Sequence, residues 1–279
     1  MSEHNINTNK RTIYSMQERN RGLIFHWIVL MIGGLRHIDI ENKQISPYYI
    51  TMPEPKLTQL QKETFDIIKD KYEFIEYPNS DDIIINNFGE QVSSDALRLG
   101  SNNIDPECYK FVNKLFSDRV EIDDTHKNKK YFISRNNSHK LLGNGGVKRR
   151  HILNENELVT KLKEYGIEFI NLEDYSLKEK INIFRQSSLI VGPNSGGLLF
   201  SIFSEKTNIV ELNIPDRVSS TIINEYFDIC KARNVPHFLF HTKRVDNEDN
   251  MTVDVDELIL YMKKNNLLII NKDNIKDEI

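Results

Sequence analysis

The segment from Leu189 to Leu212, LIVGPNSGGLLFSIFSEKTNIVEL, decides which fold this chain can adopt. It begins with an apolar run at 189–191, and a turn at 192–197 then holds three of the 12 glycines in the chain. A second apolar run, 198–203, has the length of a short helix, and 209–212 again resembles a strand. A strand, a glycine turn, a helix and another strand in this order indicate neighbouring parallel strands.

The rest of the second half continues this alternation. Strands are predicted for KYFISR, IEFINL, SLIVG, NIVELNI and PHFLFH, and helices for ENELVTKLKEYG, SLKEKINIFRQS, SGGLLFSIFS, SSTIINEYFDICKARN and residues 254–265. Ser176 and Glu179 have the spacing of a capping box at a helix start. Such alternation predicts an α/β fold, in which helices cover both faces of a parallel sheet. The second half alone has enough units for one Rossmann-like domain.

The first half shows the same pattern less clearly. We expect strands at 46–52, 72–77 and 82–87, with a helix at 57–69 between the first two. Asp105 and Pro106 have the character of an N-cap and a first helical position, and they predict a helix up to about Phe116. The segment DDTHKNKK that follows is interpreted as a linker, and the paired aspartates in it as a loop or helix cap rather than a metal motif.

Composition and charge limit the classes of function. The 279 residues are 39% hydrophobic and carry a net charge of −4, so no overall field favours nucleic acid or an acidic membrane. The two cysteines have no metal or redox spacing and are interpreted as reduced thiols. The first 20 residues are polar and carry no secretory signal, which predicts a loose start and a cytoplasmic protein. The apolar run 22–35 is shorter than a membrane span and contains His26, so a buried helix is expected, with a short membrane anchor as the alternative.

The glycine turn lies where a parallel sheet binds its ligands, beyond the carboxyl end of a strand. Glycine lets the backbone approach a ligand closely, and the positive end of a helix favours an anion such as a phosphate. Strand–turn–helix sequences with glycine also occur as simple tight turns, and this alternative stays open.

A basic block adds to the case for an anion. Between His126 and Asn154 the chain has eight lysines and arginines and no acidic residue. Such a block is often a solvated loop. Here, however, Arg135 closes a predicted strand, and Arg149 and Arg150 precede a predicted helix. Two anion-attracting features at one sheet edge suggest a diphosphate or nucleotide site.

These blocks resemble a known family. YFISR, RRHILNENEL, the turn GPNSGG and the strand NIVEL are similar in order and spacing to the core of glycosyltransferase family 61, and HW at 26–27 resembles that family's N-terminal helix. The resemblance covers residues 22–240 in scattered blocks and is densest over 131–212. Where the family has a histidine followed by GAG, this chain has Asn194 followed by SGG.

The resemblance implies a GT-B fold, in which two Rossmann-like domains with parallel sheets face a cleft. We therefore expect a loose segment at 1–19, an acceptor-side domain at 20–125 and a nucleotide-sugar-binding domain at 126–245. Residues 246–279 are expected to form a loop and a helix that pack back on the N-terminal domain.

The resemblance also implies inverting, metal-independent transfer of a hexose or pentose from a nucleotide-sugar to a glycan or glycoprotein acceptor, as in polysaccharide biosynthesis or protein glycosylation. No metal ion and no separate cofactor are implied. The positions that match the family's donor-side motifs are Arg135, Arg149, Arg150, Asn154, Gly192, Asn194, Ser195, Gly196, Gly197 and Glu211.

The chemistry of such a transfer requires a base for the acceptor hydroxyl and positive charge for the departing diphosphate. Arg135 is the candidate for the charge and His26 for the base, with Asp39 and Glu41 as alternatives to His26. Glu211, near the end of its strand, could accept hydrogen bonds from a ribose, as acidic residues do in dinucleotide folds.

Two other classes of protein remain as alternatives. A glycosyltransferase-like module that binds a glycan or a protein without catalysis is favoured by Asn194. A nucleic-acid binder is disfavoured because the basic block offers only Tyr131 and Phe132 as aromatic residues, both in a predicted buried strand.

Overall fold

The computed structural model describes residues 12–15, 24, 26–41, 48–51, 57–75, 80, 83–85, 104–136, 150–215 and 225–268. The chain divides into two compact units, Met1–Val120 and Glu121–Ile279. Each unit has its own parallel sheet, so the mixed α/β class predicted from the alternation is confirmed.

The first unit contains a four-stranded sheet in the order β3-β2-β1-β4. Its strands are β1 (Thr12–Ser15), β2 (Tyr48–Thr51), β3 (Tyr72–Phe74) and β4 (Ile83–Ile85), and all pairs are parallel. The last three were predicted, with longer bounds. The expectation of a loose start at 1–19 is wrong for Thr12–Ser15, because β1 lies inside the sheet between β2 and β4 and both Ile13 and Tyr14 are buried.

The helices of the first unit explain its apolar runs. The predicted buried helix is a π-helix, η1 (His26–Ile32), continued by α1 (Gly33–Glu41), and the residues from Trp27 to Leu35 are buried wherever they are hydrophobic. Trp27 Nε1 donates to Thr64 Oγ1 at 3.0 Å, which joins this segment to α2 (Gln59–Ile68).

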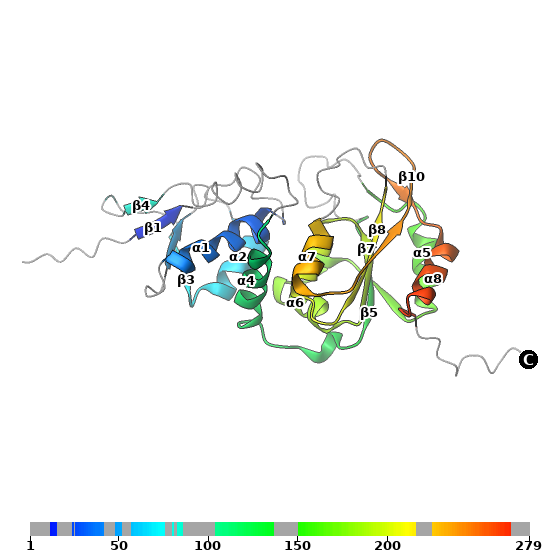
Figure 1. Ribbon diagram of the computed structural model, residues 1–279, viewed down its shortest axis with the longest axis horizontal. Coiled ribbons are helices and arrows are strands. Elements are labelled where there is room, and N and C mark those ends of the chain that lie inside the picture. Colours follow the sequence, from blue (N-terminus) through cyan, green and yellow to red (C-terminus); the bar gives the residue numbers. More distant parts are fainter. Residues whose placement is uncertain are drawn as a thin grey trace, which may run out of the picture. The chain divides into compact units, whose positions relative to one another are not determined.

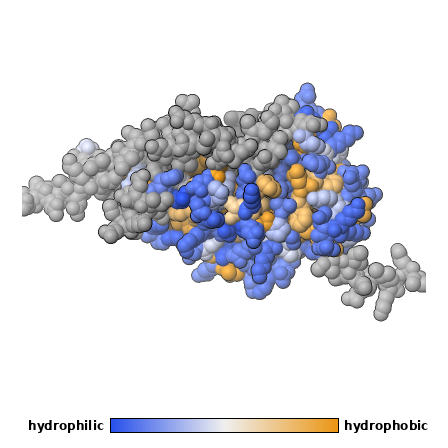
Figure 2. Space-filling model, in the orientation of Figure 1, coloured by the Kyte–Doolittle hydropathy of each residue, from blue (hydrophilic) through white to orange (hydrophobic). Residues whose placement is uncertain are grey.

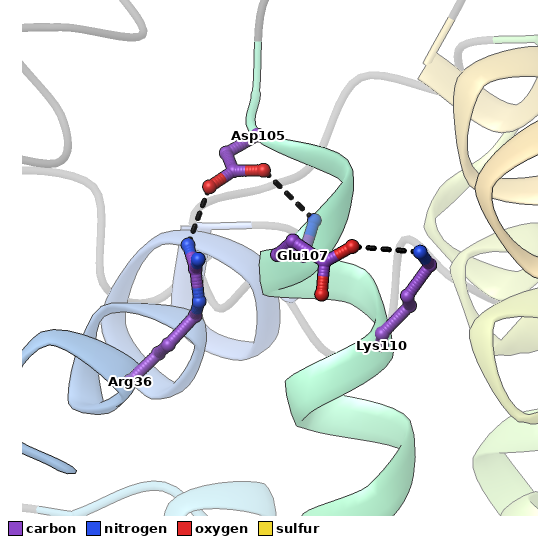
Figure 3. A network of polar contacts seen from close by, with 4 residues as sticks. All are labelled: Arg36, Asp105, Glu107 and Lys110. Carbon is purple, nitrogen blue, oxygen red and sulfur yellow. Dashed lines mark hydrogen bonds and ion pairs between the residues drawn. The ribbon is translucent and has the colours of Figure 1, made fainter. Parts of the chain in front are cut away.

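Helix α4 (Pro106–Ser117) begins as the sequence predicted. The Asp105 side chain accepts a hydrogen bond from the backbone N–H of Glu107 at 2.9 Å and also pairs with Arg36 of α1 (Figure 3). One carboxylate therefore caps α4 and ties it to α1.

The second unit contains a five-stranded parallel sheet in the order β6-β5-β7-β8-β9. Its strands are β5 (Lys130–Ile133), β6 (Ile167–Ile170), β7 (Leu189–Pro193), β8 (Asn208–Asn213) and β9 (His237–His241), and every neighbouring pair is parallel. All five were predicted from their apolar runs.

Helices cover both faces of this sheet (Figure 1). On one face lie α5 (Glu155–Lys163) and α8 (Val255–Lys264), whose apolar residues share a core with the sheet. On the other lie α6 (Leu177–Gln186), α7 (Glu225–Arg233) and the 3-10 helix η6 (Gly196–Phe203). Ser176 and Glu179 form the predicted capping box of α6, and Gly166, with a positive φ of 69°, follows the end of α5.

Three features of this unit differ from the predictions. The segment after the glycine turn is a 3-10 helix whose six residues from Leu198 to Phe203 are all buried, so packing on several sides holds it. The expected linker includes a short 3-10 helix, η3 (Asp124–His126), capped by Asp123 as the cap interpretation proposed. Helix α8, which was expected to pack on the N-terminal domain, places Leu258, Ile259 and Met262 in the core of the second unit.

Two further short elements complete the second unit. The 3-10 helix η5 (Leu172–Asp174) follows β6, and an antiparallel hairpin joins β10 (Lys243–Arg244) to β11 (Met251–Thr252). The second strand of the hairpin lies in the segment 246–279, for which the sequence analysis expected only a loop and a helix.

Candidate functional site

The strand order of the second unit marks one place on its sheet as a ligand site. From β5 the chain passes through α5 to β6 at one edge, and it then returns through α6 to β7 on the other side of β5. The connections after β5 and after β7 thus leave in opposite directions. In open α/β sheets such a switch point forms a crevice at the carboxyl ends of the strands, where ligands bind. The segments at this crevice are 134–136, after β5, and 194–197, after β7.

The glycine turn after β7 packs tightly against its neighbours. A Cβ atom on Gly192 would lie 3.4 Å from both Cβ and the carbonyl oxygen of Ile133, and one on Gly197 would lie 3.1 Å from Cδ1 of Leu172. Close packing therefore explains why glycine occupies these two positions, as the interpretation of the segment as a tight turn predicts. Gly196, by contrast, begins the 3-10 helix and is partly exposed.

Asn194 is the best-anchored residue of the turn. Its backbone N–H donates to the carbonyl of Leu212 at 3.0 Å, and its side-chain Nδ2 donates to Oε1 of Glu211 at 2.6 Å. The side chain is only 2% exposed. The amide of Asn194 is thus used inside the protein, and it fixes the start of the turn to β8.

Glu211 is buried more deeply than its position near a strand end suggested, with 1% of its surface exposed. Its second oxygen, Oε2, lies 2.8 Å from Nε2 of His237 on β9. A carboxyl group buried in this way requires hydrogen-bond partners, and Asn194 and His237 provide them. The sequence analysis missed His237, which lies in an ordinary strand pattern and carries no local signal.

Arg150 joins the basic block to the glycine turn. Its Nη1 donates to the backbone carbonyl of Asn194 at 3.1 Å. The backbone of Arg150 has a φ of 58°, in the left-handed region that side-chain-bearing residues seldom adopt. Unusual backbone conformations of this kind cluster at functional sites. Of the two neighbouring arginines predicted from the sequence, Arg150 reaches the turn and Arg149 lies outside the described residues.

Arg135 lies on a loop that a partly buried acid, Glu155, holds in place. Glu155, the first residue of α5, accepts from Ser134 Oγ at 2.8 Å through Oε1 and from Asn136 Nδ2 at 2.7 Å through Oε2. Burial raises the pKa of the Glu155 carboxyl, although both hydrogen bonds lower it. Arg135 lies between these two partners and is partly exposed at the crevice edge. Glu155 was missed, although it lies in the RRHILNENEL block.

Asn154 has a different role within the second unit, and His26 belongs to the first unit. The Asn154 side chain donates to the carbonyl of Val253 at 2.8 Å and accepts from the Val253 N–H at 3.0 Å, so it holds the chain that enters α8. His26 begins the π-helix of the first unit. The structure therefore brings together Arg150, Asn194 and Glu211 by direct contacts, with Arg135 on the facing loop.

A comparison with protein families identifies the family to which the chain belongs. The model of glycosyltransferase family 61 matches residues 25–210, which is well over half of the 279 residues. The chain therefore belongs to glycosyltransferase family 61, and the family resemblance noted in the sequence is confirmed. Membership implies a glycosyltransferase in the general sense, with a sugar donor and a glycan acceptor. A comparison with curated proteins finds no match.

The described surface is mixed in character. Hydrophilic residues cover most of it in Figure 2, interrupted by smaller hydrophobic areas. Within the described ranges, no helix combines the length and apolar character needed to cross a membrane. Nor do three or more histidine, cysteine or acidic side chains gather there in a group that could hold a metal ion.

Proposed function

We propose that this protein transfers a hexose or pentose from a nucleotide-sugar to a glycan or glycoprotein acceptor, with inversion and without a metal ion. In this proposal its two units form a GT-B enzyme, and the second unit binds the donor. The observation that carries the proposal is the contact between Arg150 and the glycine turn at the switch point of the second sheet. It places a guanidinium beside a helix start at the position where α/β sheets bind phosphates.

The donor diphosphate would lie against the turn. The first N–H groups of any helix have no partner within it, so Gly196 and Gly197 at the start of η6 can offer backbone donors. Ser195 adds a hydroxyl at the N-cap position. Because Gly196 has no side chain, a phosphate oxygen could approach its backbone closely.

Arginine would supply the charge that a metal ion supplies in other transferases. A guanidinium has five N–H donors, and the Asn194 carbonyl takes one of those on Arg150. In this proposal the positive charge of Arg150 attracts the diphosphate at the turn, and that of Arg135 on the facing loop attracts it from a second side. As the sugar leaves, both arginines would stabilise the developing charge on the nucleoside diphosphate.

For Glu211 we propose a positioning role in place of the ribose contact. Both of its oxygens have protein partners, and almost none of its surface is exposed. It would keep the side chain of Asn194 fixed and hence present the carbonyl of Asn194 to Arg150. His26 stays the candidate base that takes the proton from the acceptor hydroxyl, in the unit that would bind the acceptor.

A thermal-shift panel of nucleoside diphosphates and nucleotide-sugars, run with and without EDTA, tests the proposal. We expect one nucleoside diphosphate to stabilise the protein equally in both series, by about 2.7 kcal/mol at 100 times its dissociation constant. Stabilisation that disappears in EDTA and returns with Mn²⁺ would show that the metal-independent mechanism is wrong. If no nucleotide binds, the assignment of the donor site is wrong.

A second candidate function is a glycan-binding module without catalysis. The observation that favours it is Asn194, which replaces the histidine of the family turn and directs its amide to Glu211. Nucleotide release from a broad panel of nucleotide-sugars separates the two functions. A binding module would release none while still binding a glycan.

A further inference from the structure

We propose that the β10–β11 hairpin is a positioning element for Arg150, and that Asn250 is the side chain through which it acts. This inference rests on the donor site proposed above and extends it to residues beyond the family match, which ends at Val210. It is carried by contacts between the hairpin and residues 150–153.

The hairpin holds the segment 150–153 along its second strand. The backbone N–H of Arg150 donates to the carbonyl of Glu248 at 3.1 Å, and that of His151 donates to Oδ1 of Asn250 at 2.9 Å. Ile152 then forms a parallel bridge with Met251. The first two of these contacts hold the backbone N–H groups of Arg150 and His151. They therefore stabilise the left-handed backbone conformation of Arg150.

Side chains within the hairpin turn hold its conformation through hydrogen bonds and an ion pair. Asp246 accepts from the N–H groups of Glu248 and Asn250 through Oδ1, and from the side chain of Asn250 at 2.8 Å through Oδ2. Arg244 donates to the buried carboxylate of Asp249 at 2.7 Å and 3.1 Å. Asn250 is therefore held by Asp246 on one side while it holds the His151 amide on the other.

The consequence concerns the direction of the Arg150 side chain. The hairpin holds its backbone, and the carbonyl of Asn194 holds its guanidinium. A left-handed residue aims its side chain differently from an extended one, so loss of the backbone contacts would let Arg150 relax and turn away from the crevice. Asn250 would then influence donor affinity without contacting the donor.

The test is a double-mutant cycle between Asn250→Ala and Arg150→Ala, with Asn265→Ala as control. Asn265 likewise has a side-chain hydrogen bond to the backbone, in which it donates to the carbonyl of Tyr261 at 2.9 Å, but it lies at the end of α8. The probe is whichever of ADP, GDP, UDP and CDP binds the unmodified protein most tightly. We expect Asn250→Ala to weaken its binding about fivefold to tenfold, and to have less than a twofold effect when Arg150 is already alanine. Asn265→Ala should leave the affinity unchanged.

A second readout needs no nucleotide. The ¹⁵N signal of the Arg150 side chain, assigned by its loss in Arg150→Ala, should move toward the signals of solvated arginines in Asn250→Ala and stay in place in Asn265→Ala. Equal loss of affinity in both backgrounds, or an unmoved Arg150 signal, would overturn the inference. Absence of nucleotide binding by the unmodified protein would count against the donor site alone, because the Arg150 signal still tests the hairpin.

Discussion

At the scale of single residues, the buried side chain of Glu211 connects several parts of the second unit. A carboxylate deprived of water is costly unless hydrogen-bond donors replace the water. Glu211 obtains one donor from the glycine turn and another from β9, so three parts of the second unit meet at one functional group. This burial also makes the site sensitive to substitution, because any change that removes a partner leaves a buried carboxyl oxygen without its hydrogen bond.

We predict that Glu211→Ala lowers the free energy of unfolding by about 1–3 kcal/mol, since it leaves Asn194 and His237 without their acceptor. Urea unfolding monitored by circular dichroism measures the change. The matched control is Glu168→Ala on the edge strand β6, where the side chain is exposed and the expected change is within about 0.5 kcal/mol. Equal effects of the two substitutions would contradict the proposed anchoring role.

At the scale of elements, the sequence predicted best where the signal is local. The capping box of α6 and the Asp105 cap of α4 each depend on residues within three positions of one another, and both formed as expected. The strand β1 was missed because its four residues have only two apolar side chains, and its partners in β2 and β4 lie far along the chain. The hairpin was missed because each of its strands has only two residues.

The Asp105 cap makes stability depend on pH. Burial alone would raise the pKa of Asp105, but the Glu107 amide and the Arg36 guanidinium outweigh it and hold this pKa below its ordinary value. A lowered pKa in the folded state means stability that is present above the unfolded pKa, near 4, and is lost as the pH falls through the folded value.

Asp105→Asn should therefore destabilise the protein at pH 7 by no more than about 1 kcal/mol, because asparagine keeps the cap and loses only a partly exposed ion pair. The difference from the unmodified protein should shrink as the pH falls from 5 to 2.5. Melting temperatures across this range measure it. A difference that stays constant with pH would show that the ion pair with Arg36 contributes nothing.

At the scale of the whole molecule, the family match covers only part of the candidate site. The match ends at Val210, so Glu211, His237 and the hairpin all lie beyond it. The sequence could indicate that the glycine turn and the basic block share a sheet edge, because parallel strands have a common carboxyl end. It could not indicate that Arg150 contacts Asn194, since that contact depends on a left-handed backbone and on a hairpin nearly 100 residues later.

In the proposed enzyme, donor binding and proton transfer belong to different units, so substitutions can test them separately. Arg150→Ala removes a charge-assisted contact from the proposed donor site and should weaken nucleoside diphosphate binding about tenfold to a hundredfold. Arg150→Lys should restore only part, because lysine lacks the planar pair of donors. His26→Ala, in the first unit, should leave donor affinity nearly unchanged and lower kcat about a hundredfold.

Donor affinity, melting temperature and nucleotide release, measured on the same samples, distinguish these outcomes. A His26→Ala protein that melts earlier but keeps its activity per folded molecule would remove His26 from catalysis. Unchanged donor affinity in Arg150→Ala would remove Arg150 from the proposed site.

The position of β1 inside its sheet has a kinetic consequence. Synthesis makes β1 first, yet its two neighbours are β2, which starts at Tyr48, and β4, which starts at Ile83. The first unit cannot complete its sheet until about 70 intervening residues have been closed into loops, and such non-local pairing slows folding. During synthesis β1 therefore has unpaired edges until β2 and β4 are made, and we expect this unit to be the one that needs chaperone protection while the chain is being made.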